Sequence, residues 1–275
     1  MMKVIGIDIG GTKTSIGIVN LQNGKIIKKN IIPSKQYKND KKNLDNIINH
    51  TNNLIGNHKI NKIGIGVPEL INNKGIIKGN YNFKWHNKKL SDYFARKYKV
   101  FVDSDVRCHL RAEKLFGHGK NLDNFIYINI GTGLSYSHFK NQKIYSGANG
   151  YAIHFASSKV SLYNPNKNIK LSLVPEEYYA GKSIIKIINK HKSSKKIINN
   201  IAESLGSLIG NLINTVDPGS IVLGGGVVVH NVNFKKILIK HIRSYIFADE
   251  VKKIKILSSK LKSDTGLLGS AAIHK

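Results

Sequence analysis

The residues of this sequence that could do chemistry begin at Asp8. It closes the apolar stretch IGID, and Gly10, Gly11, Thr12 and Lys13 follow it before a second apolar stretch starts. A buried carboxylate is costly unless something neutralises it, and paired glycines let backbone N–H groups approach a ligand closely. This order of residue types favours a phosphate site, in which Asp8 holds the metal ion through water. A glycine-rich hairpin with a satisfied aspartate is the alternative.

A second glycine turn, Gly131-Thr132-Gly133, also lies between two apolar stretches. Two such turns facing across a cleft can hold the phosphates of a nucleotide from both sides. A third cluster, Gly224-Gly225-Gly226, ends the apolar stretch SIVL. It indicates either close backbone approach to an adenosine and its ribose, or a strand-to-helix turn that needs positive φ. The two readings of the third cluster do not exclude each other.

The hydrophobic pattern predicts the elements that position these turns. In the first half of the chain it predicts strands at 3–9, 14–19, 25–32, 62–67 and 100–103, a turn at Asn23-Gly24, and helices at 44–55, 88–98 and 106–116. In the second half it predicts strands at 124–131, 134–139, 143–145, 220–226 and 253–257, a loop at 147–150, a polar region to about 170, and helices at 181–192, 196–214, 233–247 and 264–274.

The same order of strands and helices, βββαβαβα, therefore occurs twice. Such a duplication predicts two α/β halves with a cleft between them. Ligands of these sheets bind beyond the carboxyl ends of the parallel strands, where the glycine turns are expected.

The net charge of +28 over 275 residues invites a nucleic-acid hypothesis. The lysines are spread along the chain together with abundant Asn and Ile. All three have A/T-rich codons, so base composition is a sufficient cause. No zinc-finger, helix-turn-helix or RNA-recognition pattern is present. We expect no specific nucleic-acid partner, and only weak adhesion to polyanions at low salt.

The remaining bulk features are those of a cytoplasmic enzyme. The hydrophobic content is 41%, and no apolar run approaches the length of about 18 residues that spans a bilayer. The first strand is entered at Val4, so we expect no signal peptide. The single cysteine, Cys108, excludes an internal disulfide and a multi-cysteine zinc site.

Eight motifs together resemble the ROK family of sugar kinases and related repressors, within the actin-like ATPase superfamily. They are IDIGGTKT (7–14), GIGVP (64–68), NFKW (82–85), VDSD (102–105), AEKLFG (112–117), IGTG (130–133), GANG (147–150) and VDPGSIVLGGG (216–226). The resemblance covers nearly the whole chain and implies a two-lobed, actin-like (ribonuclease H-like) α/β fold. It also implies phosphorylation of a hexose or amino sugar that depends on ATP and Mg²⁺. Repressors of the family carry an N-terminal helix-turn-helix, and we expect none ahead of the first strand.

Asp105 matches the catalytic aspartate of the family. It lies just past the predicted strand VFVD, where a carboxylate can accept the proton of a sugar hydroxyl as that hydroxyl attacks the γ-phosphate. The alternative is a helix N-cap, a role that Ser104 or Asp105 can fill. The resemblance also gives candidate substrate contacts. These are Glu69, Asn82, Ser104, Asn149, Gly150, His154 and Glu176.

The sequence departs from the family pattern around the sugar. Ser104 stands where the family has Asn, Glu69 where it has Gly, and His154 where it has the glutamate that grips sugar hydroxyls. Ser157 replaces the zinc-binding histidine, and the zinc cysteines expected before Glu176 are absent, so we expect no zinc site. His154 is either a partner of a sugar hydroxyl or an ordinary polar residue beside a loop.

From the resemblance we predict an ATP-dependent sugar kinase that is similar to glucokinases. The alternative is a non-catalytic regulator that keeps the fold and binds a sugar or a nucleotide. We expect ATP, Mg²⁺ and a sugar as the ligands, no membrane partner, and a homodimer. The predicted lobes are residues 1–118, with helix 264–275 packing back on them, and residues 119–263. Trp85 is expected to serve packing rather than sugar stacking.

Overall fold

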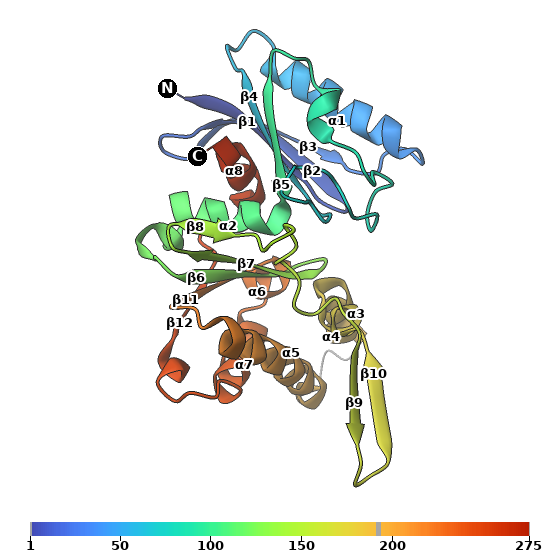
Figure 1. Cartoon of the computed structure of the whole chain (residues 1–275), viewed down its shortest axis with the longest axis vertical. Coiled ribbons are helices and arrows are strands. Elements are labelled where there is room, and N and C mark those ends of the chain that lie inside the picture. The colour runs from blue at the N-terminus through green and yellow to red at the C-terminus, as the bar shows by residue number, and fades with distance from the viewer. Residues whose placement is uncertain (1, 191–193, 275) are drawn as a thin grey trace. The chain divides into compact units, whose positions relative to one another are not determined.

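The computed structural model describes residues 2–190 and 194–274 of the chain (Figure 1). Its contacts group the chain into two units. The first comprises Met1–Leu122, Phe139–Ala152 and Lys260–Lys275, and the second comprises Asp123–His138 and Ile153–Ser259. The lobes predicted at 1–118 and 119–263 remain a prediction, and residue 275 of the predicted closing helix lies outside the described residues.

The first unit is built on a five-stranded sheet in the order β3-β2-β1-β4-β5. Helix α1 covers one face of this sheet, and α2 and α8 cover the other (Figure 1). The elements are β1 (Lys3–Ile9), β2 (Lys13–Asn20), β3 (Lys25–Pro33), α1 (Asp40–Ile55), β4 (Lys62–Val67), β5 (Lys99–Ser104), α2 (Asp105–Phe116) and α8 (Thr265–Ala271).

The register of this sheet brings its acidic residues to one edge. Strand β1 runs antiparallel to β2, and β1, β4 and β5 run parallel to one another. Asp8 pairs with Gly66 of β4, and Gly66 pairs with Asp103 of β5. The carboxyl ends of β1 and β5, which flank β4, therefore carry Asp8 and Asp103, and Asp105 lies one residue beyond β5.

Helix α8 lies directly on the backbone of β1 and β4. A side chain at Gly6 would overlap the carbonyl of Leu267, and one at Gly64 would overlap the carbonyl of Ser270. Only glycine fits at these two positions because the helix leaves no space for a Cβ. The alternation of Gly and Ile in IGID and IGIG thus places glycines against the helix and isoleucines in the core.

A second five-stranded sheet repeats the strand order of the first, as β8-β7-β6-β11-β12. Strand β11 runs parallel to both β6 and β12. The elements are β6 (Phe125–Ile130), β7 (Leu134–Lys140), β8 (Lys143–Tyr145), β9 (Val160–Asn164), β10 (Ile169–Leu173), α3 (Pro175–Tyr179), α4 (Gly181–Lys190), α5 (Lys195–Val216), β11 (Ser220–Gly224), α6 (Gly226–His230), α7 (Val232–Ser244) and β12 (Lys255–Ser258). The predicted duplication of the βββαβαβα core is confirmed, with a single 3₁₀ turn in place of the helix between β4 and β5.

Two regions were predicted wrongly. Residues 88–98 form a 3₁₀ turn at Leu90–Tyr93, not a helix, because burying Leu90 and Phe94 requires one turn only and Phe94 is already extended. The polar region to about 170 contains the antiparallel hairpin β9–β10, whose alternating VSLYN and IKLSL flank a turn rich in Asn. The helix predicted at 181–192 is described to Lys190, and its last two residues lie outside the described residues.

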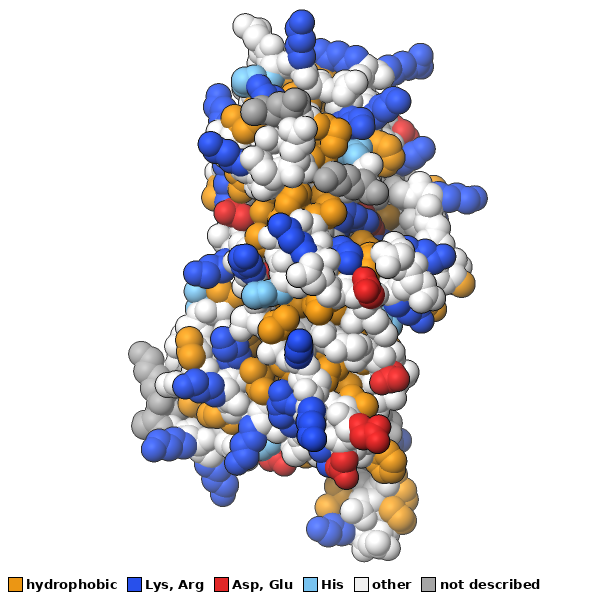
Figure 2. All heavy atoms as spheres, turned by 90° about the vertical axis from the view of Figure 1, so that its left-hand side faces the viewer, with side chains coloured by type: hydrophobic (Ala, Val, Ile, Leu, Met, Phe, Trp, Pro, Cys, Tyr) orange, Lys and Arg blue, Asp and Glu red, His pale blue; other side chains and the backbone are white. Residues whose placement is uncertain are grey.

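On the face in Figure 2, Lys and Arg are interspersed with uncharged side chains, and acidic ones are few. Among the described helices, none combines the length and apolarity needed to cross a bilayer.

Candidate active site

The turn between β1 and β2 is closed by its own backbone. The N–H of Gly10 donates to the carbonyl of Lys13 at 3.0 Å, and the N–H of Ser34 donates to the carbonyl of Thr12 at 3.0 Å. Neither Gly10 nor Gly11 has a positive φ. Gly11 therefore serves to let another group approach the backbone closely, since a Cβ there would lie 3.1 Å from Oδ1 of Asn82.

The Asp8 carboxylate is half-buried at the end of β1, and no hydrogen bond or ion pair holds it among the described residues. Burial raises the pKa of Asp8 to about 6, and the charges of Lys13 and Lys29 offset part of this rise. Gly266, at the start of α8, lies against the carboxylate: a Cβ there would overlap it, with Oδ1 at 2.6 Å. The side chain is thus confined and electrostatically unsatisfied, which is a costly state for a carboxylate without a cation.

Asp105 is the first residue of α2. Ser104 occupies the N-cap position, with no capping hydrogen bond from its side chain. Oδ1 of Asp105 accepts from the N–H of Val106 at 2.7 Å and from the hydroxyl of Ser104 at 3.4 Å. Burial, followed by the negative charge of Asp8, raises the pKa of Asp105 to about 7. A carboxyl that titrates near neutrality is matched to proton transfer at physiological pH.

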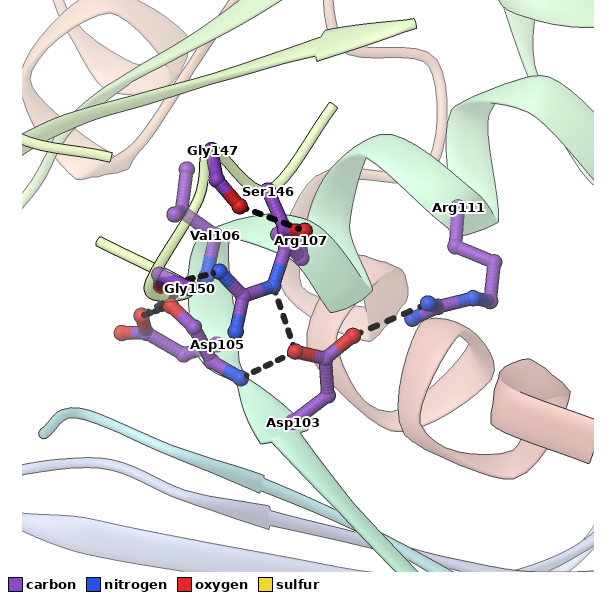
Figure 3. Close-up of polar contacts among 9 residues, drawn as sticks. Asp103, Asp105, Val106, Arg107, Arg111, Ser146, Gly147 and Gly150 are labelled. Atoms are coloured by element: carbon purple, nitrogen blue, oxygen red, sulfur yellow. Dashed lines mark hydrogen bonds and ion pairs between the residues drawn. The ribbon is translucent and has the colours of Figure 1, made fainter. Parts of the chain in front are cut away.

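Asp103, two residues earlier, is fully engaged. Its Oδ1 accepts from Nε of Arg107 at 2.5 Å and its Oδ2 from Nη2 of Arg111 at 2.9 Å, as Figure 3 shows. Burial alone would raise the pKa of Asp103, but the two arginine charges and their hydrogen bonds outweigh it and hold the pKa below its ordinary value. Asp103 therefore remains ionised. Asp105 makes no hydrogen bond with Arg107 or Arg111 among the described residues.

The Glu69 carboxylate is occupied by backbone donors. Its side chain is buried, and its two oxygens accept from the backbone N–H groups of Tyr81 (3.1 Å), Asn82 (2.5 Å) and Phe83 (3.0 Å). A carboxylate with three backbone donors has little capacity left for sugar hydroxyls. Glu69 instead holds the segment that carries Asn82, whose Nδ2 donates to the Pro68 carbonyl at 2.8 Å.

Trp85 packs, as expected. It is fully buried, its ring stacks on that of Phe83 with 4.1 Å between centroids, and its Nε1 donates to the Asp40 carbonyl at 3.2 Å.

The glycine turn of the second unit is also closed by a backbone hydrogen bond. The N–H of Gly131 donates to the carbonyl of Gly133 at 3.1 Å. Glu176, in α3, closes this turn from the side, because its Oε1 accepts from the N–H of Leu134 at 2.7 Å and a Cβ on Gly133 would lie 2.6 Å from that oxygen. Thr132, at the tip, is exposed.

The third glycine cluster lies beside this turn. Gly225 has φ of +88° and is the N-cap of α6, so the reading as a strand-to-helix turn is realised. A Cβ on Gly225 would overlap the backbone of Ile130, next to Gly131, and one on Gly224 would overlap the hydroxyl of Tyr127. The structure therefore brings residues 131–133, 224–226 and Glu176 together within the second unit.

His154 lies in the same unit and is exposed. Its Nδ1 is 3.0 Å from the hydroxyl of Ser157, so the two residues that depart from the family pattern contact each other. Desolvation by neighbouring segments lowers the pKa of His154, and the charge of Glu176 offsets part of the change. Among residues 2–190 and 194–274, no group of three His, Cys, Asp or Glu side chains could hold a metal ion.

Five residues that contact the candidate site were missed from the sequence. Asp103, at the end of β5, and Arg107 and Arg111, in α2, are spaced at four-residue steps, and this spacing was a detectable signal for contact between them. Gly266 and Tyr127 gave no such signal, because their contacts with Asp8 and Gly224 join segments far apart in the chain.

Comparison with known proteins gives the family. A sequence model of the ROK family matches residues 4–160 and 157–275. A glucokinase of Thermotoga maritima is 25% identical over 311 residues, which cover 100% of this chain and 98% of the relative. A xylose repressor of Bacillus subtilis is 25% identical over 230 residues, which cover 77% of this chain and 60% of the relative.

A solved structure with the same fold is that of a ROK family glucokinase from Streptomyces griseus in complex with glucose and AMPPNP. It superposes with a TM-score of 0.82 at 21% identity, over 98% of each chain. The fold is therefore the actin-like α/β ATPase fold with its duplicated core, as predicted. The chain belongs to the ROK family, whose matched members include sugar kinases and repressors.

Proposed function

We propose that this protein transfers the γ-phosphoryl group of ATP to a hydroxyl of a hexose or amino sugar. The observation that carries the proposal is Asp105, a carboxyl with a pKa of about 7 at the start of α2, near a second carboxylate and the glycine turn of the same unit. The family relationship supports it, since sugar kinases are among the matched relatives.

Asp105 acts as the general base. Above pH 7 its carboxylate is ionised and accepts the proton of the sugar hydroxyl as that oxygen attacks phosphorus. The hydrogen bonds from Val106 and Ser104 orient Oδ1 and leave Oδ2 for the hydroxyl. Phosphoryl transfer otherwise depends on positioning and charge stabilisation.

The donor set fits magnesium. Asp8 offers a hard, unsatisfied carboxylate beside a turn with exposed backbone, and Mg²⁺ characteristically takes one or two carboxylates, waters and substrate phosphates. When bound, the ion supplies charge neutralisation to the phosphates. Its charge would also relieve the repulsion between Asp8 and Asp105.

The remaining site residues are assigned to their ligands unit by unit. In the first unit, we assign residues 10–13 to phosphate, and Asn82, Ser104, Asn149 and Gly150 to the sugar. In the second unit, we assign residues 131–133 to phosphate, 224–226 to adenosine, and His154 and Glu176 to the sugar. Glu69 acts indirectly, through its hold on Asn82. The protein acts in the cytoplasm as a homodimer.

A non-catalytic regulator is the second candidate. The xylose repressor is as similar as the glucokinase in percentage identity. His154 and Ser157 also bond to each other where kinases of the family use a glutamate and a zinc ligand.

A screen of ADP release over hexoses and N-acetylhexosamines with Mg²⁺ separates the two functions. A kinase releases ADP with at least one sugar, and Asp105→Asn reduces that release by several orders of magnitude. Sugar or nucleotide binding without ADP release would support the regulator. Near-normal turnover by Asp105→Asn would refute the assignment of the base.

A further inference from the structure

The loop of residues 146–150 carries Asn149, a proposed sugar ligand, and two side chains from outside the loop hold it. Nδ2 of Asn73 donates to the carbonyl of Ala148 at 2.8 Å, and Nη1 of Arg107 donates to the carbonyl of Gly150 at 2.8 Å. Asn149 lies between these two anchored carbonyls, and its side chain is exposed. The backbone on both sides of Asn149 is therefore fixed.

Gly150 itself has little room to move. It is buried, it has φ of +88°, and a Cβ there would lie 2.6 Å from the carbonyl oxygen of Ile71. The backbone of residues 71–72 and the hydrogen bond from Arg107 thus confine the end of the loop.

Arg107 makes a second contact at the same time. Its Nε donates to Oδ1 of Asp103 at 2.5 Å while Nη1 reaches Gly150, as Figure 3 shows. The side chain is only 5% exposed. A planar guanidinium with donors in several fixed directions can bridge two acceptors in this way, whereas a lysine ammonium on a flexible stem offers no such fork.

Asp103 carries the connection to the candidate base. The oxygen that accepts from Arg107 also accepts from the backbone N–H of Ser104 at 2.8 Å, and Ser104 is bonded directly to Asp105. Arg111 holds the other oxygen of Asp103, and among the described residues it makes no hydrogen bond with the loop. Arg107 and Asp103 therefore connect Gly150, the chain neighbour of Asn149, with Ser104, the chain neighbour of Asp105.

We propose that Arg107 is a positioning residue that sets the spacing between Asp105 and the sugar-binding loop at Asn149. The proposal rests on the proposed kinase function, and it concerns a role that Arg107 plays through Asp103 and Gly150. The acceptor hydroxyl must meet both the base and its binding partner, and a misplacement of about 1 Å can cost about 100-fold in rate. The Asp103–Arg107 ion pair therefore determines where the hydroxyl lies relative to the base.

The test compares Arg107→Lys with the matched control Arg111→Lys. Both variants keep a cation beside Asp103, but only the first loses the contact with Gly150. For Arg107→Lys we expect the sugar KM to rise about tenfold and kcat to fall, with the KM for ATP unchanged, since a lost buried hydrogen bond typically has this effect. For Arg111→Lys we expect a sugar KM within about twofold of the parent, with any loss confined to Tm.

Asn73→Ala provides a second arm, because it frees the other end of the loop without touching Asp103 or Asp105. Its sugar KM should rise while kcat is retained. Equal effects of Arg107→Lys and Arg111→Lys on sugar KM would overturn the proposal, because they would indicate a structural role alone.

Hydrogen exchange of the amides of residues 147–152 gives a readout that needs no activity. We expect exchange at least about tenfold faster in Arg107→Lys than in the parent, and unchanged in Arg111→Lys. Unchanged exchange in Arg107→Lys would refute the anchor. If the parent phosphorylates no sugar, the proposed function fails, and the exchange data still decide whether Arg107 holds the loop.

Discussion

Replacing the candidate base by its amide should stabilise the protein at alkaline pH. Burial and the charge of Asp8 raise the pKa of Asp105 from the ordinary value of 3.8 to about 7. A carboxyl whose pKa is raised by folding holds its proton more tightly in the folded state than in the unfolded state. Its contribution to the free energy of unfolding is therefore fully present below pH 3.8 and is lost as the pH rises through about 7. Asp105→Asn never ionises, and its Oδ1 can still accept from Val106 and Ser104, so the variant escapes this loss.

The magnitude follows from the two pKa values. At about 1.4 kcal/mol per pH unit, the difference corresponds to about 4 kcal/mol in the free energy of unfolding at pH 8. The side chain is partly exposed, and solvent screening reduces the effect to about 2 kcal/mol. For a protein of this size that is about 4–8 °C in Tm. At pH 5 the gain should be less than half as large, since the carboxyl of the parent is then mostly protonated.

The assay is thermal unfolding of parent and variant from pH 5 to 8, without nucleotide and with EDTA to remove divalent ions. Asp249→Asn is the control, because Asp249 is exposed and pairs with Lys252 at 2.6 Å; it should give no stabilisation. A Tm of Asp105→Asn equal to or below that of the parent at pH 8 would refute the argument that Asp105 is a strained, buried carboxylate. Because the same variant is expected to lose turnover, we expect function at this site to oppose stability.

Three further predictions concern neighbouring parts of the site. Gly266→Ala crowds the Asp8 carboxylate, so the Mg²⁺ concentration for half-maximal turnover should rise about tenfold. An unchanged magnesium requirement would contradict this, and so would an equal loss of magnesium affinity when Gly266→Ala is added to Asp8→Asn. Because the pKa of His154 is lowered, the sugar KM should rise only below about pH 6.5, and His154→Ala should abolish that dependence; a flat KM in the parent from about pH 5 to 8 would exclude His154 from the sugar site. Glu69→Gln places an amide donor against backbone donors. It should therefore lower the free energy of unfolding by about 1–3 kcal/mol, shift the fluorescence of Trp85, and raise the sugar KM. Parent-like unfolding and fluorescence would show that the segment of Asn82 does not depend on Glu69.

The sequence predicted the duplicated core because strand and helix periods are local signals. The strands around Asp8 and the glycine turn at 131–133 lie within one or two residues of their predicted bounds. The helix predicted at residues 88–98 was wrong because Leu90 and Phe94 have helical spacing in the sequence. In the structure, a single turn followed by extended chain buries both side chains. The hairpin β9–β10 was missed although its strands alternate in the ordinary way.

The candidate site was less predictable, because its decisive contacts join distant segments. Nothing near Glu69 in sequence indicates that three N–H groups of residues 81–83 occupy its carboxylate. The contact between Arg107 and Gly150 spans 43 residues and depends on how the sheet edge and the loop meet. Residue types predicted the chemistry, whereas the tertiary structure determines which groups remain available for it.

The position of α8 has a consequence for biosynthesis. The helix packs on β1 and β4 through Gly6 and Gly64, and it brings Gly266 against Asp8. A nascent chain therefore leaves the part of its first sheet that α8 covers exposed while roughly 160 further residues, from the end of β5 to the start of α8, are translated. At about 5–20 residues per second this lasts on the order of ten seconds or more, and during that interval the exposed part of the sheet invites chaperones or aggregation. Gly266 comes to lie against the Asp8 carboxylate only after both sheets have been translated, so a chain truncated before α8 would have both sheets but would lack the helix that covers Asp8.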